Sequence, residues 1–148
     1  MRAIGYRSTA DPDDLSSLVE WQLPDPQPGP SDLLVQVEAV SVNPVDTKVR
    51  RRERPAAGEV RVLGWDAAGT VLDLGAEVQG FAVGDRVWYA GALQRPGCNS
   101  ELHLVDHRLA ARRPSTISAA QAASLPLTAI TAWELLFDRL RLQQEIGR

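Results

Sequence analysis

The sequence has little of several residue types that define common protein classes, and each shortage excludes a class. One cysteine, Cys98, among 148 residues rules out an internal disulfide and a zinc site built from several thiolates. The 16 basic residues against 19 acids give a net charge of −3, without the basic excess of a nucleic-acid-binding protein. No apolar run approaches the roughly 20 residues that span a bilayer, and the N-terminus is too acidic for a signal peptide. We therefore expect a cytoplasmic protein without a nucleic-acid or membrane partner.

The composition is otherwise that of a globular protein with one real core. Hydrophobic residues make up 44% of the chain and charged residues 24%, both ordinary values. Short apolar runs are separated by glycine and proline over the first 110 residues, which is typical of short strands joined by turns. The expected strands include residues 1–6, 18–23, 33–42, 70–72, 87–89 and 100–106. This spacing predicts a small, partly open β-barrel.

The strand expected at residues 33–42 has the clearest pattern. Val35 and Val37 alternate with polar neighbours, as in a strand with one buried face. Asn43 and Pro44 should end it, since proline cannot donate to a ladder, and should leave residues 43–47 at a strand end facing a cleft. Residues 49–58 are expected to form a polar loop. Its arginines form either a solvated surface or an attractive field for a phosphate-bearing ligand.

The composition becomes helical after residue 117. Ser118 and Gln121 have the spacing of a capping box that opens a short alanine-rich helix, which Pro126 interrupts. Thr128 can cap a second helix. On this second helix, three- and four-residue steps place apolar side chains on one face: Ile130, Trp133, Leu136, Phe137 and Leu140. We expect this face to be exposed and to favour a homo-oligomer.

Four motifs in order resemble the medium-chain dehydrogenase/reductase superfamily. They are VEAVSVNPVDTK (37–48), RVLGWDAAGTV (61–71), GDRVWYAG (84–91) and SLPLTAITAWELLFDRL (124–140). Within the superfamily the chain is most similar to the zinc-independent quinone oxidoreductase branch, often described as zinc-type alcohol dehydrogenase-like. The resemblance implies a mainly β (α+β) chain. Residues 1–117 would form a GroES-like catalytic domain, and residues 118–148 a helical connector toward a Rossmann domain.

The resemblance also implies NADPH as cofactor, bound between the catalytic and Rossmann domains. These 148 residues contain no G-x-G-x-x-G loop to cradle a pyrophosphate. We therefore expect a catalytic-domain portion whose Rossmann domain is missing and which is inactive alone. The alternative is a non-catalytic GroES-like remnant or a protein-interaction module.

The alcohol dehydrogenases of the superfamily hold a catalytic zinc, and the same motifs allow a comparison by position. Where those enzymes carry cysteine, histidine and a further cysteine, this chain has Asn43, Trp65 and Leu127. Indole and isobutyl groups cannot bind zinc, and an amide is a poor ligand. The acidic neighbour of the histidine position is kept as Asp66. The expectation is a reductase without zinc.

The resemblance implies hydride transfer from NADPH to a quinone or enone, with the protein supplying orientation. Asn43 would face the nicotinamide, Thr128 would face the cofactor, and Asp46 would orient its neighbours. Lys48 stands where quinone reductases often have tyrosine. A buried lysine there would donate a proton, but the simpler interpretation is an exposed loop lysine without a catalytic role. Trp65 and Tyr89 are assigned to the substrate pocket. From the residues alone, Asn43, Asp46 and Thr128 also fit common turn or helix-cap roles.

The two histidines and the cysteine are expected to be structural. His103 and His107 are four residues apart, but on a strand running into a turn they need not share a face. Cys98 has no paired base in the sequence pattern and is expected to be an incidental loop thiol.

Overall fold

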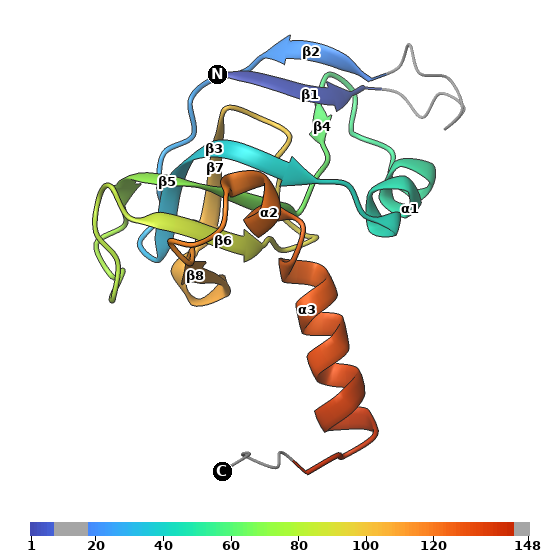
Figure 1. The fold of residues 1–148 in the computed structure, drawn as a ribbon. Helices are drawn as coiled ribbons and strands as arrows, with labels where there is room; N and C mark the ends of the chain where they lie inside the picture. The colour runs from blue at the N-terminus through green and yellow to red at the C-terminus, as the bar shows by residue number, and fades with distance from the viewer. Residues whose placement is uncertain (8–17, 144–148) are drawn as a thin grey trace.

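The computed structural model describes residues 1–7 and 18–143, which form two antiparallel sheets and three α-helices. The smaller sheet has the order β2–β1–β4, from β1 (Arg2–Tyr6), β2 (Val19–Gln22) and β4 (Arg61–Val62). It lies above the rest of the molecule in Figure 1. The isolated bridge between Ala3 and Ser100 connects it to the segment that leads into β7 (Leu102–Asp106) of the larger sheet.

The larger sheet has five strands in the order β7–β3–β5–β6–β8. Its members are β3 (Asp32–Ser41), β5 (Asp66–Leu74), β6 (Arg86–Ala90), β7 (Leu102–Asp106) and β8 (Ala110–Arg112). A short 3-10 turn, η2 (His107–Leu109), joins the last two. The two sheets remain separate in the described residues, so the predicted mainly β architecture is confirmed as a pair of sheets rather than a closed barrel.

The main core lies on one face of the larger sheet. Leu33 and Val35 are fully buried there and alternate with partly exposed neighbours, as the strand pattern predicted. They pack with Val71, Val87 and other side chains of the central strands. The opposite face near Ala68 is covered by α2 (Ala119–Ala123).

Residues 44–52 correct one sequence prediction. They form helix α1 (Pro44–Arg52), where a strand-end segment and a polar loop were expected. Asn43 is its N-cap in an extended conformation, and Asp46 accepts a 2.8 Å hydrogen bond from the Asn43 backbone N–H. Proline at the first helical position has a φ suited to a helix and lacks only an N–H that would be unsatisfied anyway. The Asn-Pro pair therefore ends one element and begins the next.

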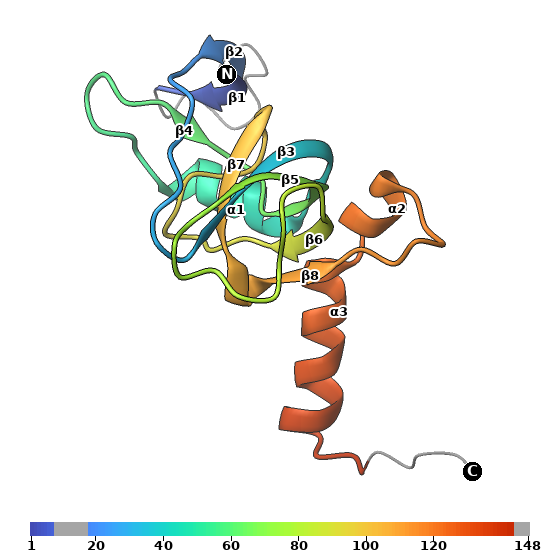
Figure 2. The same ribbon diagram turned by 90° about the vertical axis from the view of Figure 1, so that its left-hand side faces the viewer.

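The C-terminal helices follow the expected order. Ser118 and Gln121 form the predicted capping box of α2. Helix α3 (Pro126–Trp133) begins at the proline, with Leu125 as N-cap, so Thr128 lies inside the first turn and is not the cap. A π-helical segment, η3 (Glu134–Arg139), continues it. In Figures 1 and 2 this helical arm projects away from the sheets.

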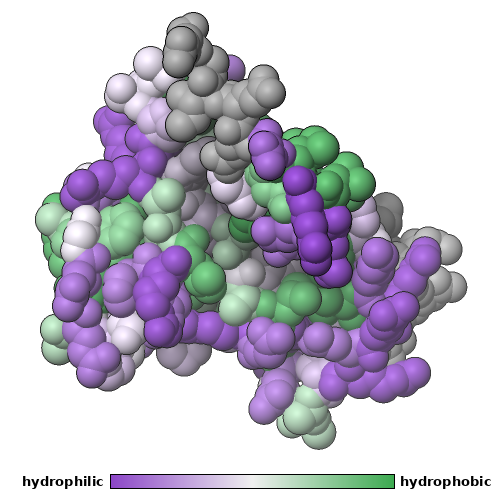
Figure 3. Space-filling model, turned by 90° about the horizontal axis from the view of Figure 1, so that it is seen from below, coloured by the Kyte–Doolittle hydropathy of each residue, from purple (hydrophilic) through white to green (hydrophobic). Residues whose placement is uncertain are grey.

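Much of the arm's apolar surface is uncovered. Trp133 is 56% exposed, Ile130 48% and Leu140 58%. Figure 3, which views the molecule from below, shows apolar patches between hydrophilic side chains on this side. No helix in residues 1–7 or 18–143 has the length and apolar character to cross a membrane.

Candidate functional site

The buried polar residues of the resembling motifs gather where β3, β5, α1 and α3 meet. Ser41, at the end of β3, pairs with Asp66, at the start of β5. The chain then turns through Asn43 into α1, which brings the first turn of that helix beside β5. Asn43 is 8% exposed, Asp46 5% and Asp66 0%. These three residues form the candidate site.

Hydrogen bonds join the site to the connector helix. The Asn43 side-chain Nδ2 donates to Asp66 Oδ2 at 3.0 Å. The backbone N–H of Leu127 donates to Asp66 Oδ1 at 3.0 Å and to Oδ2 at 3.3 Å. The Asp66 carboxylate thus connects the N-terminus of α1 with that of α3.

The two carboxyl groups of the site differ in environment. Burial raises the pKa of Asp66, and the hydrogen bonds from Asn43 and Leu127 oppose that rise. The charge of Asp46 raises the pKa of Asp66 further. One oxygen of Asp46, Oδ1, is buried without a hydrogen-bond partner among the described residues. Such an atom is an acceptor available to a donor group that enters the site.

The other predicted cofactor and catalytic residues lie outside this buried cluster. Lys48 is exposed on α1, which agrees with the simpler reading of an exposed lysine. Thr128 is exposed on α3, and its hydroxyl donates to the Leu125 carbonyl oxygen at 2.9 Å. Thr128 follows Leu127 directly, so its backbone is tied to the site although its side chain is not.

Trp65 and Tyr89, predicted to line a substrate pocket, are both core side chains. Each is 2% exposed, and they belong to different apolar clusters. The Trp65 Nε1–H donates to the Ala92 carbonyl oxygen at 3.2 Å. Tyr89 bonds His103 at 3.0 Å. Their assignment to a pocket stays a prediction.

A groove with a volume of about 490 Å³ lies beside β1 and the end of β3. Ile4, Val40 and Val42 contribute to its largely apolar wall. Asn43, Asp46 and Asp66 are not among its lining residues. The groove is therefore separate from the candidate site.

The residues at the zinc-ligand positions do not fit zinc. Trp65 points into the core, Leu127 is apolar, and the amide nitrogen of Asn43 is engaged with Asp66. Over the described ranges, no group of three or more His, Cys, Asp or Glu residues could hold a metal ion. Zinc needs several nitrogen, sulfur or carboxylate ligands around one point, which these side chains do not provide.

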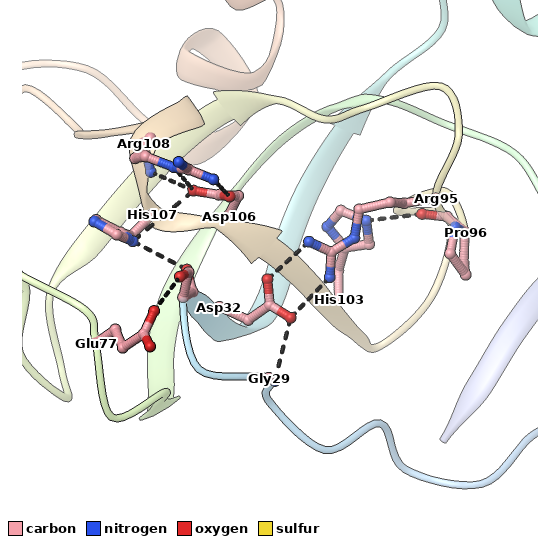
Figure 4. Close-up of polar contacts among 10 residues, drawn as sticks. Gly29, Asp32, Glu77, Arg95, Pro96, His103, Asp106, His107 and Arg108 are labelled. Carbon is pink, nitrogen blue, oxygen red and sulfur yellow. Dashed lines mark hydrogen bonds and ion pairs between the residues drawn. The ribbon is translucent and has the colours of Figure 1, made fainter.

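The histidines have separate structural partners (Figure 4). His103 lies between the Tyr89 hydroxyl and the Pro96 carbonyl oxygen, each 3.0 Å from a ring nitrogen. His107 Nδ1 is 3.0 Å from the Ser31 carbonyl oxygen. Cys98 is fully buried, and burial raises the pKa of its thiol, which makes it a poor nucleophile.

Acid is expected to destabilise the protein through His103. Burial lowers the pKa of His103 from 6.5 to about 4, with a smaller lowering by Arg95. The unfolded chain therefore takes up a proton below about pH 6.5, while the folded chain does so only near pH 4. The contribution of neutral His103 to the free energy of unfolding is fully present above about pH 6.5. It falls by about 3 kcal/mol as the pH drops from there to about 4.

Guanidinium unfolding at pH 7.5 and pH 5 measures the part of this loss reached by pH 5, about 2 kcal/mol. In His103→Gln the loss between the two pH values should shrink, whereas His107→Gln should keep it. An equal pH dependence in wild type and His103→Gln would show that another group is responsible.

Asp66 is the site residue that sequence reasoning undervalued. Its identity as a retained acid was visible beside Trp65, but its partners were not. One partner is a backbone N–H 61 residues away, which no side-chain motif can reveal. The sequence signal for such a site was a single acid at the start of an apolar strand. A carboxylate buried there needs hydrogen-bond donors from elsewhere in the fold.

Comparisons with known proteins identify the family of the chain. The family model described as the alcohol dehydrogenase GroES-like domain matches residues 29–117. A zinc-type alcohol dehydrogenase-like protein of Staphylococcus epidermidis is 41% identical over 145 residues, covering 98% of this chain and 43% of that protein. The chain therefore spans less than half the length of this relative.

Solved structures show the same fold. An alcohol dehydrogenase superfamily protein from Novosphingobium aromaticivorans is 38% identical with a TM-score of 0.83, over 97% of this chain and 43% of that one. Escherichia coli quinone oxidoreductase complexed with NADPH is 30% identical with a TM-score of 0.80, over 92% of this chain and 40% of that one. The chain belongs to the GroES-like domain family of the alcohol dehydrogenases, within the medium-chain dehydrogenase/reductase superfamily.

Proposed function

We propose that this chain is the catalytic-domain portion of a zinc-independent, NADPH-dependent oxidoreductase that reduces a quinone or an activated alkene. The observation that carries the proposal is the bridge from Asn43 through Asp66 to Leu127. Its two ends stand at motif positions of zinc ligands, but an engaged amide and an isobutyl side chain are unsuited to zinc. The NADPH complex of the Escherichia coli relative supports the choice of cofactor. When bound, NADPH supplies a hydride.

The roles of individual residues follow from their positions. Asn43 and Thr128 would contact the nicotinamide half of the cofactor, Asn43 through its amide and Thr128 from the first turn of α3. Asp46 would orient Asn43 through its bond to the Asn43 N–H. Lys48 remains a candidate proton donor from the surface of α1. The proposal also divides the chain between residues 117 and 118. It places the protein in the cytoplasm, with which one free, buried thiol is compatible.

A chimera tests this function. The part of Escherichia coli quinone oxidoreductase that matches this chain is replaced by it, and NADPH oxidation is followed with a quinone and with an enone. We expect turnover that a zinc chelator does not reduce. Asn43→Ala should lower the rate at least about tenfold, as the loss of one positioned hydrogen bond of roughly 1.4 kcal/mol or more does, while the exposed Glu59→Gln should not.

The free 148-residue chain is the second protein measured in that test. It contains no glycine-rich phosphate loop, so it should show no saturable tryptophan quenching at micromolar NADPH. A folded chimera that binds NADPH but reduces neither acceptor would contradict the proposed function. Activity abolished by chelation would contradict its zinc independence.

The exposed arm leads us to propose that the isolated chain self-associates through α3 and η3. Burying Trp133 and Ile130 against a second copy would remove apolar surface from water. Sedimentation velocity at increasing concentration should show a rising mean mass, reversed by Trp133→Glu. Thr131→Glu adds the same charge on another side of the helix and should have less effect. A monomer at every concentration would refute self-association.

A further inference from the structure

Asp66 lies at a junction of three chain segments. Its backbone belongs to β5 and pairs with Ser41 on one side and Ala90 on the other. Its carboxylate faces Asn43, the N-cap of α1, and Leu127, the second residue of α3. One side chain therefore contacts the beginnings of two helices from a position fixed by two strands.

The carboxylate determines which way the Asn43 amide is turned. An ionised carboxylate only accepts hydrogen bonds, so the Nδ2 end of Asn43 must face Asp66. The reversed amide would set two oxygens against each other. The amide oxygen of Asn43 is thus turned away from Asp66, and it is the hydrogen-bond acceptor of the capping box that begins α1.

The same carboxylate holds the first turn of α3. Both of its oxygens lie within hydrogen-bond distance of the Leu127 N–H, one of the donors that a helix leaves without an internal partner. The arm contacts the sheets through β5 and β6 near its N-terminus and then projects away from them. Its direction therefore depends on what holds that first turn.

The position of Asp66 is well fixed. Its side chain is fully buried, and the Cys98 thiol lies 3.5 Å from its carbonyl oxygen. Groups held on paired strands and surrounded by packed atoms are positioned more accurately than groups on loops. Asp66 can therefore transmit a fixed geometry to both helix ends.

We propose that Asp66 is a positioning residue that couples the Asn43 amide to the N-terminus of α3, so that Asn43 and Thr128 are held as one unit. The coupling itself does not require the proposed function; only its consequence for the nicotinamide rests on it. Asp66 acts through Asn43 and Leu127 rather than by touching the reacting atoms.

The first test follows two nitrogen signals of the intact 148-residue chain by NMR as the pH is lowered. If one carboxylate binds both groups, the Leu127 amide and the Asn43 side-chain amide should shift with the same midpoint, above the ordinary Asp value of 3.8. Asp46 and Cys98 are the other titratable groups near Asp66. In Asp46→Asn the shared inflection should persist. Two different midpoints would overturn the coupling.

The second test changes one end and reads the other. Asn43→Ala removes the amide donor, whose hydrogen bond lowers the pKa of Asp66. The midpoint seen at the Leu127 amide should therefore move upward. A role confined to local packing would leave that midpoint in place, and an unchanged value would contradict the proposal.

The third test is hydrogen exchange in Asp66→Asn, which keeps the side-chain volume but removes one acceptor. Exchange at Leu127 should accelerate on the order of 10- to 100-fold, the range of a hydrogen bond to a charged group. Asp73→Asn, the same substitution at an exposed position of β5, should leave it unchanged. Unchanged exchange in a folded Asp66→Asn variant would refute the coupling. If that variant does not fold, the wild-type and Asn43→Ala titrations decide.

These readouts separate the two proposals. An inactive chimera with a shared titration midpoint would overturn the function and leave the coupling standing. An active chimera with independent midpoints would do the reverse.

Discussion

Gly69→Val is expected to leave the chain without a cooperative unfolding transition. A Cβ atom at Gly69 would lie 2.1 Å from the Gln36 carbonyl oxygen and 2.7 Å from Val35 Cγ1. Gly69 pairs with Val37 at the centre of the β3–β5 ladder, so the clash is with backbone that both strands hold in place. Overpacking usually costs about 1–3 kcal/mol when a side chain can move, and here the nearest atom is backbone.

Circular dichroism during urea unfolding measures this effect. Gly69→Ala should already lower the unfolding midpoint strongly, because the Cβ alone makes the clash. Gly91→Ala is the matched control, since its nearest neighbour would be 3.5 Å away, an ordinary contact. A Gly69→Val protein with a wild-type transition would mean that β3 and β5 do not approach as described.

Trp65→Ala is expected to cost about 3–5 kcal/mol of unfolding free energy, the usual range for emptying a buried aromatic site. The indole is 2% exposed and packs with Tyr6, Val49 and Leu63. Removing it also leaves the Ala92 carbonyl oxygen without its donor. Trp65→Phe keeps most of the volume and should cost less.

The control for Trp65→Ala is Trp133→Ala, at a residue that is 56% exposed, measured in protein dilute enough to be monomeric. Surface substitutions usually change stability by less than about 0.5 kcal/mol. This comparison also decides the sequence-based assignment of Trp65 to a substrate pocket. A pocket residue would alter the substrate KM of the chimera with little loss of stability, whereas a core residue would lower stability first.

The strands were the most predictable part of the fold. Alternation in residues 33–42 predicted the buried face of β3, because side chains of a strand point to opposite faces in turn. The strand expected at residues 70–72 proved longer, as β5 (Asp66–Leu74). Gly64, with a φ of +94°, lies just before it, and Gly69 within it has no room for a Cβ atom beside the backbone of β3. The local pattern therefore located this strand but not its full length.

Helix α1 was less predictable because two signals overlap. Pro44 ends a strand and also suits the first turn of a helix, and the following residues are polar on most sides. The other local signal for a helix was the spacing of Asn43 and Asp46. Asn43 is the N-cap, and the Asp46 carboxylate accepts from its backbone N–H. The arginines after it weakened the apolar pattern on which helix prediction depends.

The candidate site was predictable in its residues but not in its connections. Asn43 and Asp46 could be named from motifs, and both are buried beside Asp66. Thr128 and Lys48 come from the same motifs but have exposed side chains. Burial depends on how distant segments meet, and spacing along the chain does not contain that information.

The joining of the two sheets has a consequence for the order of folding during synthesis. Arg2 bonds Glu101, 99 residues later, and Ala3 bridges Ser100. Chains that depend on such distant contacts fold slowly, because a long loop must close before the contact forms. Strand β1 can pair early with β2 and then with β4, but its bridge to Ser100 must wait until the ribosome has released about two thirds of these residues. The first strand made is therefore among the last to be completed.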